Sequence, residues 1–234
     1  MKWKVSVLIF TGISAILLLF YLNRVLWIER LLLHVSAPVF GKVWQSEVQK
    51  FRQLYPLDSA QVFFLGDSHM EQCEWHEVLP EWNCANRGIG SETSEGLLSR
   101  LDCLPENGNN RTVFLQTGVN DLIAGKSAQE VLERYQKVLD RLSSAGYRVV
   151  PTLVFPVRYL SGVNDGVPFL NEGIRKLAAS RGLRLIDLNP YLLEERKLRA
   201  EFSFDGVHLN ADGYQLWLKE IRKHLAKPAD SGFR

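Results

Sequence analysis

This chain of 234 residues has few cysteines, a small net charge and no visible sequence repeat. Its 3 cysteines are too few for a disulfide scaffold and lack the paired short spacing of a zinc ribbon. A net charge of +2 gives no sign of a nucleic-acid-binding surface, so no nucleic-acid partner is expected. Apolar residues make up 46% and charged residues 23%, which excludes wholesale disorder and fibrous proteins and indicates an ordinary globular domain.

One long uncharged run lies near the N-terminus, at residues 5–22. As a helix, its 18 residues would rise about 27 Å, close to the ~30 Å hydrocarbon core of a membrane. Lys2 and Lys4 precede the run, as in a signal peptide, but no convincing cleavage site follows it. We therefore predict that residues 1–22 are an uncleaved transmembrane signal anchor. A cleaved signal peptide and a buried core helix are the alternatives.

The charges on either side of this run predict its orientation. The two lysines before it favour an N-terminus inside the cytosol, although two arginines after it partly offset them. We expect a single-pass membrane protein whose domain lies on the extracytosolic, periplasmic side. In that oxidising setting, Cys73 and Cys84 could form a disulfide.

The rest of the chain divides into a connecting segment, one domain and a tail. Residues 23–57 are predicted to be largely helical, packed either on the domain or on the membrane surface. Within them, apolar side chains share one helical face at Trp44, Val48, Phe51 and Tyr55. The domain is predicted to span residues 58–227, and residues 228–234 form a C-terminal tail.

From residue 60 onward, short apolar runs alternate with amphipathic stretches. The expected strands are residues 61–65, 82–86, 111–116, 148–155 and 183–188. The expected helices are residues 70–78, 94–104, 128–144, 168–180 and 212–225. This alternation predicts an α/β domain, with a parallel sheet wrapped by helices. Ligands of such sheets bind at the carboxyl ends of the strands.

Polar residues gather where these strands end. A serine, a histidine, an aspartate, an amide and a glycine-rich turn are together the parts needed for acyl transfer. The four segments are Gly66-Asp67-Ser68-His69, Asn86-Arg87-Gly88-Ile89-Gly90-Ser91, Gly118-Val119-Asn120-Asp121 and Asp205-Gly206-Val207-His208.

Chemistry assigns roles to three of these residues. A serine hydroxyl is a poor nucleophile, so Ser68 needs a base, and His208 can serve. The imidazole must be held in one tautomer and one orientation, and Asp205 can do both through Nδ1. Ser68, Asp205 and His208 are therefore the predicted catalytic residues.

The oxyanion of an acyl-transfer intermediate needs preorganised hydrogen-bond donors. Three are available: the backbone N–H of Ser68, a backbone N–H in the turn at Gly90 and Ser91, and the side-chain amide of Asn120. We predict that these donors form the oxyanion hole.

The four segments, in this order over residues 60–226, resemble the SGNH (GDSL-type) hydrolase superfamily. The resemblance implies a flavodoxin-like three-layer α/β/α fold with a five-stranded parallel sheet. It also implies hydrolysis of esters, sometimes of thioesters or amides, without a cofactor. By the same resemblance, Ser68 is the nucleophile, Asn120 an oxyanion donor, His208 the base and Asp205 its partner.

The chain departs from the family pattern at one position. The family's oxyanion glycine usually falls five residues after the asparagine of the second motif, where this chain has Ser91. A serine still carries a backbone N–H, so activity need not be lost. Whether Gly90 or Ser91 supplies the donor stays open.

Structural roles are the alternative for several polar residues. Asp67 and Asp121 are expected to order their turns. His69, Cys73 and His76 share one face of a predicted helix, as metal ligands do, but a pocket-lining or surface role for His69 is preferred, and no metal is expected.

The sequence thus predicts a membrane-anchored serine esterase acting on a small-molecule or glycan ester. Short acyl groups such as acetyl, on cell-envelope carbohydrate, are the favoured substrates. A lysophospholipase or thioesterase, and an O-acyltransferase, are alternatives that use the same residues. An inactive membrane-anchored binding module is the alternative from another class.

Overall fold

The computed structural model describes residues 41–55, 60–159 and 161–225. The chain separates into two units, Met1–Ser46 and Glu47–Arg234, and the fold and the site lie in the second. Residues 41–53 are helical, and the side chains of Val48 and Phe51 are buried.

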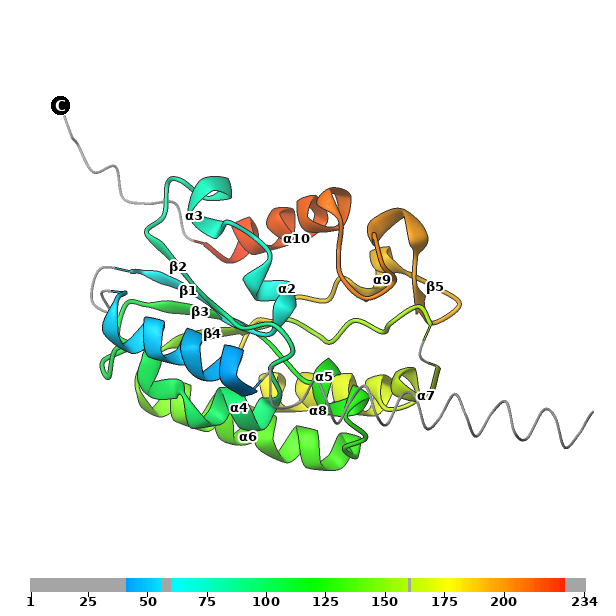
Figure 1. The fold of residues 1–234 in the computed structure, drawn as a ribbon, viewed down its shortest axis with the longest axis horizontal. Coiled ribbons are helices and arrows are strands. Elements are labelled where there is room, and N and C mark those ends of the chain that lie inside the picture. The colour runs from blue at the N-terminus through cyan, green and yellow to red at the C-terminus, as the bar shows by residue number, and fades with distance from the viewer. Residues whose placement is uncertain (1–40, 56–59, 160, 226–234) are drawn as a thin grey trace, which may run out of the picture. The chain divides into compact units, whose positions relative to one another are not determined.

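A parallel sheet of four strands forms the centre of this unit, in the order β2-β1-β3-β4 (Figure 1). β1 pairs with both β2 and β3, and β3 pairs with β4. The prediction of a parallel sheet is confirmed. The strands are β1 (Val62–Gly66), β2 (Cys84–Gly88), β3 (Thr112–Gln116) and β4 (Arg148–Pro151).

In the described part of the chain, the expected fifth strand at residues 183–188 is reduced to a single parallel bridge between Thr152 and Ile186. The bridge is held by Ile186 N donating to Pro151 O at 2.8 Å and by Leu153 N donating to Ile186 O at 3.0 Å. A proline has no N–H to return to the neighbouring strand, so the ladder cannot continue past Pro151. The predicted five-stranded sheet is therefore wrong in strand number.

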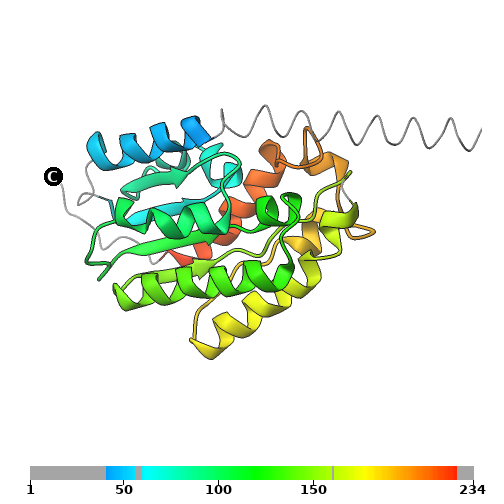
Figure 2. The ribbon, with the colours of Figure 1, turned by 60° about the horizontal axis from the view of Figure 1, so that its bottom comes forward.

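Alternate strand residues face two separate cores, as a pleated strand requires. Phe63 and Leu65 belong to one core, and Val62 and Phe64 to the other. Helices α4, α5, α6 and α8 cover the first face, and α2, α3, α9 and α10 cover the second (Figures 1 and 2). The unit is thus a three-layer α/β/α domain.

The helices follow the strands in chain order. The longer ones carry caps: Ser127 forms a capping box at the start of α6, and the Asn210 side chain accepts a hydrogen bond from Gly213 N at the start of α10. Their bounds are α2 (Ser68–Glu71), α3 (Trp75–Val78), α4 (Ser94–Ser99), α5 (Val119–Ile123), α6 (Ala128–Ser144), α7 (Ser161–Asn164), α8 (Val167–Ser180), α9 (Asn189–Leu192) and α10 (Ala211–His224).

Smaller elements complete the described chain. Two short strands pair antiparallel between α9 and α10, and two 3₁₀ turns follow α4 and β6. They are β5 (Leu193–Glu194), β6 (Lys197–Leu198), Leu101–Cys103 and Ala200–Phe202.

The expected helix over residues 70–78 is broken into α2 and α3. Side chains take the carbonyl groups that the next helical turn would have used. Trp75 Nε1 donates to Met70 O at 2.7 Å, and Asn86 Nδ2 donates to Glu71 O at 3.0 Å and to Cys73 O at 3.1 Å.

The prediction of a single-pass membrane protein with a periplasmic domain is contradicted. Within residues 41–55, 60–159 and 161–225, no helix is both long enough and apolar enough to cross a membrane. The 17-residue helix α6, for instance, carries charges such as Glu130 and Arg141. The predicted anchor at residues 1–22 and the tail at residues 228–234 lie outside the described residues.

Candidate active site

A tight turn between β1 and α2 presents Ser68. Gly66 ends β1 with a φ of 155°, and a Cβ atom there would lie 2.0 Å from Gln116 O, so only glycine fits. Asp67 then caps α2, because its Oδ1 accepts a hydrogen bond from His69 N at 3.1 Å. Ser68 is therefore the first residue of α2, at the carboxyl edge of the sheet.

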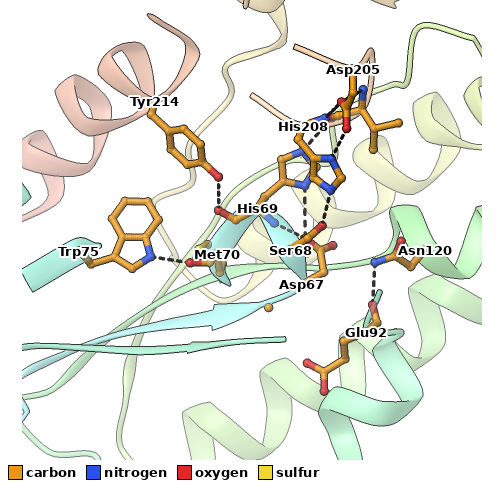
Figure 3. A network of polar contacts seen from close by, with 12 residues as sticks. Asp67, Ser68, His69, Met70, Trp75, Glu92, Asn120, Asp205, His208 and Tyr214 are labelled. Carbon is orange, nitrogen blue, oxygen red and sulfur yellow. Dashed lines mark hydrogen bonds and ion pairs between the residues drawn. The ribbon is translucent and has the colours of Figure 1, made fainter. Parts of the chain in front are cut away.

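The structure brings Ser68, His208 and Asp205 into one chain of contacts (Figure 3). Ser68 Oγ lies 2.9 Å from His208 Nε2, and His208 Nδ1 lies 2.6 Å from Asp205 Oδ2. Ser68 and His208 are 140 residues apart in sequence. A carboxylate can only accept a hydrogen bond from Nδ1–H, which leaves Nε2 free to accept one from the serine hydroxyl.

The loop of residues 205–208 holds its own carboxylate in place. Asp205 Oδ1 accepts hydrogen bonds from Val207 N and His208 N, each at 2.8 Å. Partial burial raises the pKa of Asp205, but the hydrogen bonds from the His208 ring and from the two N–H groups outweigh it and bring the pKa to about 2. Asp205 is therefore ionised at neutral pH and able to orient the imidazole.

Candidate oxyanion donors come from three segments of the chain. Within the described part of the chain, the N–H groups of Ser68, Gly90 and Ser91 donate to no protein acceptor. Ser91 has a φ of 60°, a left-handed conformation that glycine adopts most easily. Asn120, in the first turn of α5, donates one amide hydrogen to Glu92 O at 3.1 Å, which leaves its second hydrogen available (Figure 3).

A buried ion pair that the sequence analysis missed supports this turn. Glu92 and Arg100 have 0% of their side chains exposed. Arg100 Nε donates to Glu92 Oε1 at 2.6 Å, and its Nη2 donates to Glu92 Oε2 and, at 2.8 Å, to Arg87 O. The pair thus connects the end of β2 to the turn that carries Gly90 and Ser91. Charged residues normally predict surface positions, so nothing in the sequence marked them.

Asp121 ties the Asn120 loop to the same turn. Its Oδ2 accepts a hydrogen bond from Ser94 N, and its Oδ1 accepts one from Ser94 Oγ, both at 2.7 Å. Burial raises the pKa of Asp121, and the Ser94 hydrogen bonds offset that effect only in part. The residue therefore orders the start of α4.

His69 and His76 do not share a face, contrary to the predicted helix. His69 is 1% exposed, whereas the side chain of His76 is 63% exposed. The described residues contain no group of three side chains able to hold a metal ion. The His69 ring instead lies between the Asp67 carboxylate and the Val207 carbonyl oxygen.

The proposed pairing of Cys73 with Cys84 is absent, because both thiols are free. Burial raises the pKa of each to about 12, with a smaller contribution from a neighbouring glutamate. Burial also raises the pKa of Cys103. These thiols are therefore poor nucleophiles at neutral pH.

Comparisons with known proteins agree with this geometry. Curated N-acylneuraminate cytidylyltransferases of Streptococcus agalactiae are 25% identical over 136 residues, which cover 54% of this chain and 33% of the serotype V protein. The chain thus spans about a third of the length of these relatives.

Solved structures show the same fold. A Streptococcus pneumonia protein provisionally described as a platelet activating factor superposes with a TM-score of 0.75 and 22% identity, covering 84% of this chain and 99% of that one. A GDSL-like lipase of Bacteroides thetaiotaomicron gives 0.64 and 19%, covering 77% and 96%. The acetyl xylan esterase AlAXEase gives 0.58 and 21%, covering 70% and 99%.

A model of one family matches most of the domain. It covers residues 64–216, which include all four sequence segments at the strand ends. The chain therefore belongs to the GDSL-like lipase/acylhydrolase family, a family of ester hydrolases.

Proposed function

We propose that this protein is a serine ester hydrolase in which Ser68, His208 and Asp205 are the catalytic residues. The observation that carries the proposal is the run of two short contacts, 2.9 Å from Ser68 Oγ to His208 Nε2 and 2.6 Å from His208 Nδ1 to Asp205 Oδ2. These distances lie within the range that proton transfer between a nucleophile and its base requires.

The reaction proceeds in two acyl transfers. Ser68 Oγ attacks the ester carbonyl carbon while its proton passes to His208 Nε2, and the C=O π electrons move onto the carbonyl oxygen. When the tetrahedral intermediate collapses, the bond to the alcohol breaks and His208 returns the proton to the leaving oxygen. Water then repeats the sequence on the acyl-serine, with His208 as base, and releases the carboxylic acid.

Donors from three segments stabilise the oxyanion of each intermediate. The backbone N–H of Ser68, one N–H at Gly90 or Ser91, and the free amide hydrogen of Asn120 take this role. Their support is that the backbone groups have no protein acceptor in the described chain and that the Glu92 carbonyl orients the Asn120 amide.

The substrate class that we propose is a short-chain acyl ester, such as acetyl, on a carbohydrate. One structural neighbour points this way by its name, an acetyl xylan esterase. Exposed aromatic rings also flank the 205–208 loop. Phe204 is 67% exposed and stacks on the His208 ring, and Tyr159 is 75% exposed and lies against Gly206. Flat aromatic faces of this kind suit the apolar face of a sugar ring.

Hydrolysis of p-nitrophenyl esters from acetate to palmitate tests both parts of the proposal. We expect kcat/KM to be greatest for acetate and to fall with acyl length. A fluorophosphonate probe should label the wild-type protein at Ser68 and leave Ser68→Ala unlabelled.

Three outcomes would overturn these assignments. A preference for palmitate would replace the carbohydrate ester by a lipid, and unlabelled protein without hydrolysis would favour a binding module. Transfer of the acetyl group to an added sugar faster than to water would identify an acyltransferase instead.

A further inference from the structure

We propose that His69 is a positioning residue, whose imidazole joins the helix carrying Ser68 to the loop carrying Asp205 and His208. The proposal rests on the function proposed above for these three residues. It concerns a second carboxylate–imidazole pair, Asp67 and His69, whose ring centre lies 5.6 Å from that of His208 (Figure 3).

Each nitrogen of the His69 ring faces a hydrogen-bond acceptor. Nε2 lies 3.0 Å from Val207 O, and a carbonyl oxygen can only accept, so Nε2 must carry a hydrogen. Nδ1 lies 3.3 Å from Asp67 Oδ1, the atom that also accepts the His69 backbone N–H. A carboxylate also only accepts, so the contact with Asp67 is a hydrogen bond only in the ring form that carries hydrogens on both nitrogens. The bond to Val207 O requires only the hydrogen on Nε2.

Packing leaves this ring no other position. Its edge meets the Phe155 ring at 5.3 Å and 80°, and its centre lies 5.6 Å from the His208 ring. Tyr214 Oη donates to His69 O at 2.8 Å, which fixes the backbone of the same residue. His69 is 1% exposed, so its ring is shut off from solvent, and its hydrogen bond to the catalytic loop is the one to Val207 O.

Val207 stands between the two catalytic residues of the loop. Its N–H donates to Asp205 Oδ1, and its carbonyl accepts from His69, so the peptide units on its two sides are held by different partners. Apart from the contact of Ser68 with His208, this is the one hydrogen bond in the described chain between α2 and residues 203–209. The bond from His69 to Val207 O thus holds the 205–208 loop in the position that brings His208 Nε2 to 2.9 Å from Ser68 Oγ.

The hydrogen bond to Val207 O depends on a histidine at the position that follows the serine. In the motif G-D-S-L a leucine follows the serine, whereas this chain has His69 in that place. A leucine could fill the space beside Phe155 but could not donate to Val207 O. The connection therefore depends on the imidazole at this position.

The test compares three substitutions of His69 with one control. Gln places its amide nitrogen near the position of Nε2 and can still donate to Val207 O. Asn places its amide near Nδ1, so it can reach Asp67 but falls short of Val207, and Leu reaches neither. His76→Leu, on the exposed surface of α3, is the control.

With p-nitrophenyl acetate, we expect His69→Leu and His69→Asn to lower kcat about tenfold, the effect of one lost hydrogen bond, with KM changed by less than about twofold. His69→Gln should stay within about threefold of wild type, and His76→Leu should match wild type. If His69→Leu does not fold, the comparison of Gln with Asn carries the same test, because both are polar and similar in size.

A second readout separates this proposal from the function on which it rests. In a Ser68→Ala background, the downfield NMR signal of the His208 Nδ1 hydrogen reports the bond to Asp205 without any turnover. We expect it to broaden in His69→Leu and to persist in His69→Gln. An unchanged signal with kcat within twofold of wild type, or an equal loss in Gln and Leu, would overturn the proposal. Absence of ester hydrolysis by the wild type would overturn the function alone.

Discussion

Replacing Glu92 by leucine should destabilise the domain more than any surface ion-pair substitution. The change removes the carboxylate that binds two nitrogens of Arg100, and neither side chain has any exposed surface. Arg100 cannot lose its proton at neutral pH, so its charge would stay buried, and within the described chain the backbone carbonyls of Arg87 and Gly66 are the hydrogen-bond acceptors left to it. Breaking one side of a buried pair costs about 3–5 kcal/mol in the free energy of unfolding.

A similar pair on the surface supplies the matched control. Arg52 and Asp102 also form two Arg–carboxylate hydrogen bonds, of 2.9 and 3.0 Å, but their side chains are 47% and 59% exposed. Asp102→Ala should therefore cost no more than about 1 kcal/mol. The geometry of the two pairs is alike, so the difference between the two variants measures burial.

Urea unfolding followed by tryptophan fluorescence measures both losses, and thermal unfolding should show a midpoint lowered by about 6–20 °C for Glu92→Leu. The double variant with Arg100→Met should lose less than the sum of the two single variants, because no charge is then left unpaired. A loss in Glu92→Leu as small as that in Asp102→Ala would refute the reasoning.

Three further predictions concern chemistry. Ser68→Ala and His208→Ala should each lower kcat by about 10⁴–10⁶-fold, and the double variant should lose little more, because the two residues act as one unit. If steady-state kinetics show that Ser68→Ala keeps about a tenth of the wild-type kcat, this prediction is wrong. Asn120→Ala should lower kcat by ~10²–10³-fold with a much smaller change in KM. Ser91→Gly should change kcat by less than about threefold, and a loss above about tenfold in this variant would mean that the Ser91 hydroxyl takes part. Ellman's reagent at pH 8 should leave all 3 cysteines of the folded protein essentially unlabelled, because burial raises the pKa of Cys73 and Cys84 to about 12 and raises that of Cys103 as well. The rate of labelling should increase with pH. In guanidinium without reductant all 3 thiols should react, and a smaller number would indicate a disulfide.

Local patterns were enough to predict much of the architecture. The buried runs of β1 and β3 and the amphipathic helix α6 were all visible in the pattern of apolar residues. The gathering of polar side chains at the strand ends was also predictable, because a parallel sheet places the carboxyl ends of its strands at one edge. That rule puts Ser68 and Asn120 together although about fifty residues separate them.

Where the local signals misled, a remote residue or a missing donor was the cause. The expected helix over residues 70–78 ends early because Asn86, on β2, takes the carbonyl groups of Glu71 and Cys73. The fifth strand stops at a bridge because Pro151 has no N–H to give. Neither effect shows in the hydrophobic pattern, since both depend on which segments become neighbours.

By itself, then, the sequence determined the layered class, the order of the elements and which residue types stand at the strand ends, because these follow from the periodicity of side chains along a short segment. Only the tertiary structure decided that Glu92 and Arg100 are buried together, that His69 reaches Val207, and that the cysteines stay apart. Burial and pairing are properties of two segments that meet in space. His69 and Val207 are 138 residues apart, and no pattern within either segment records the other.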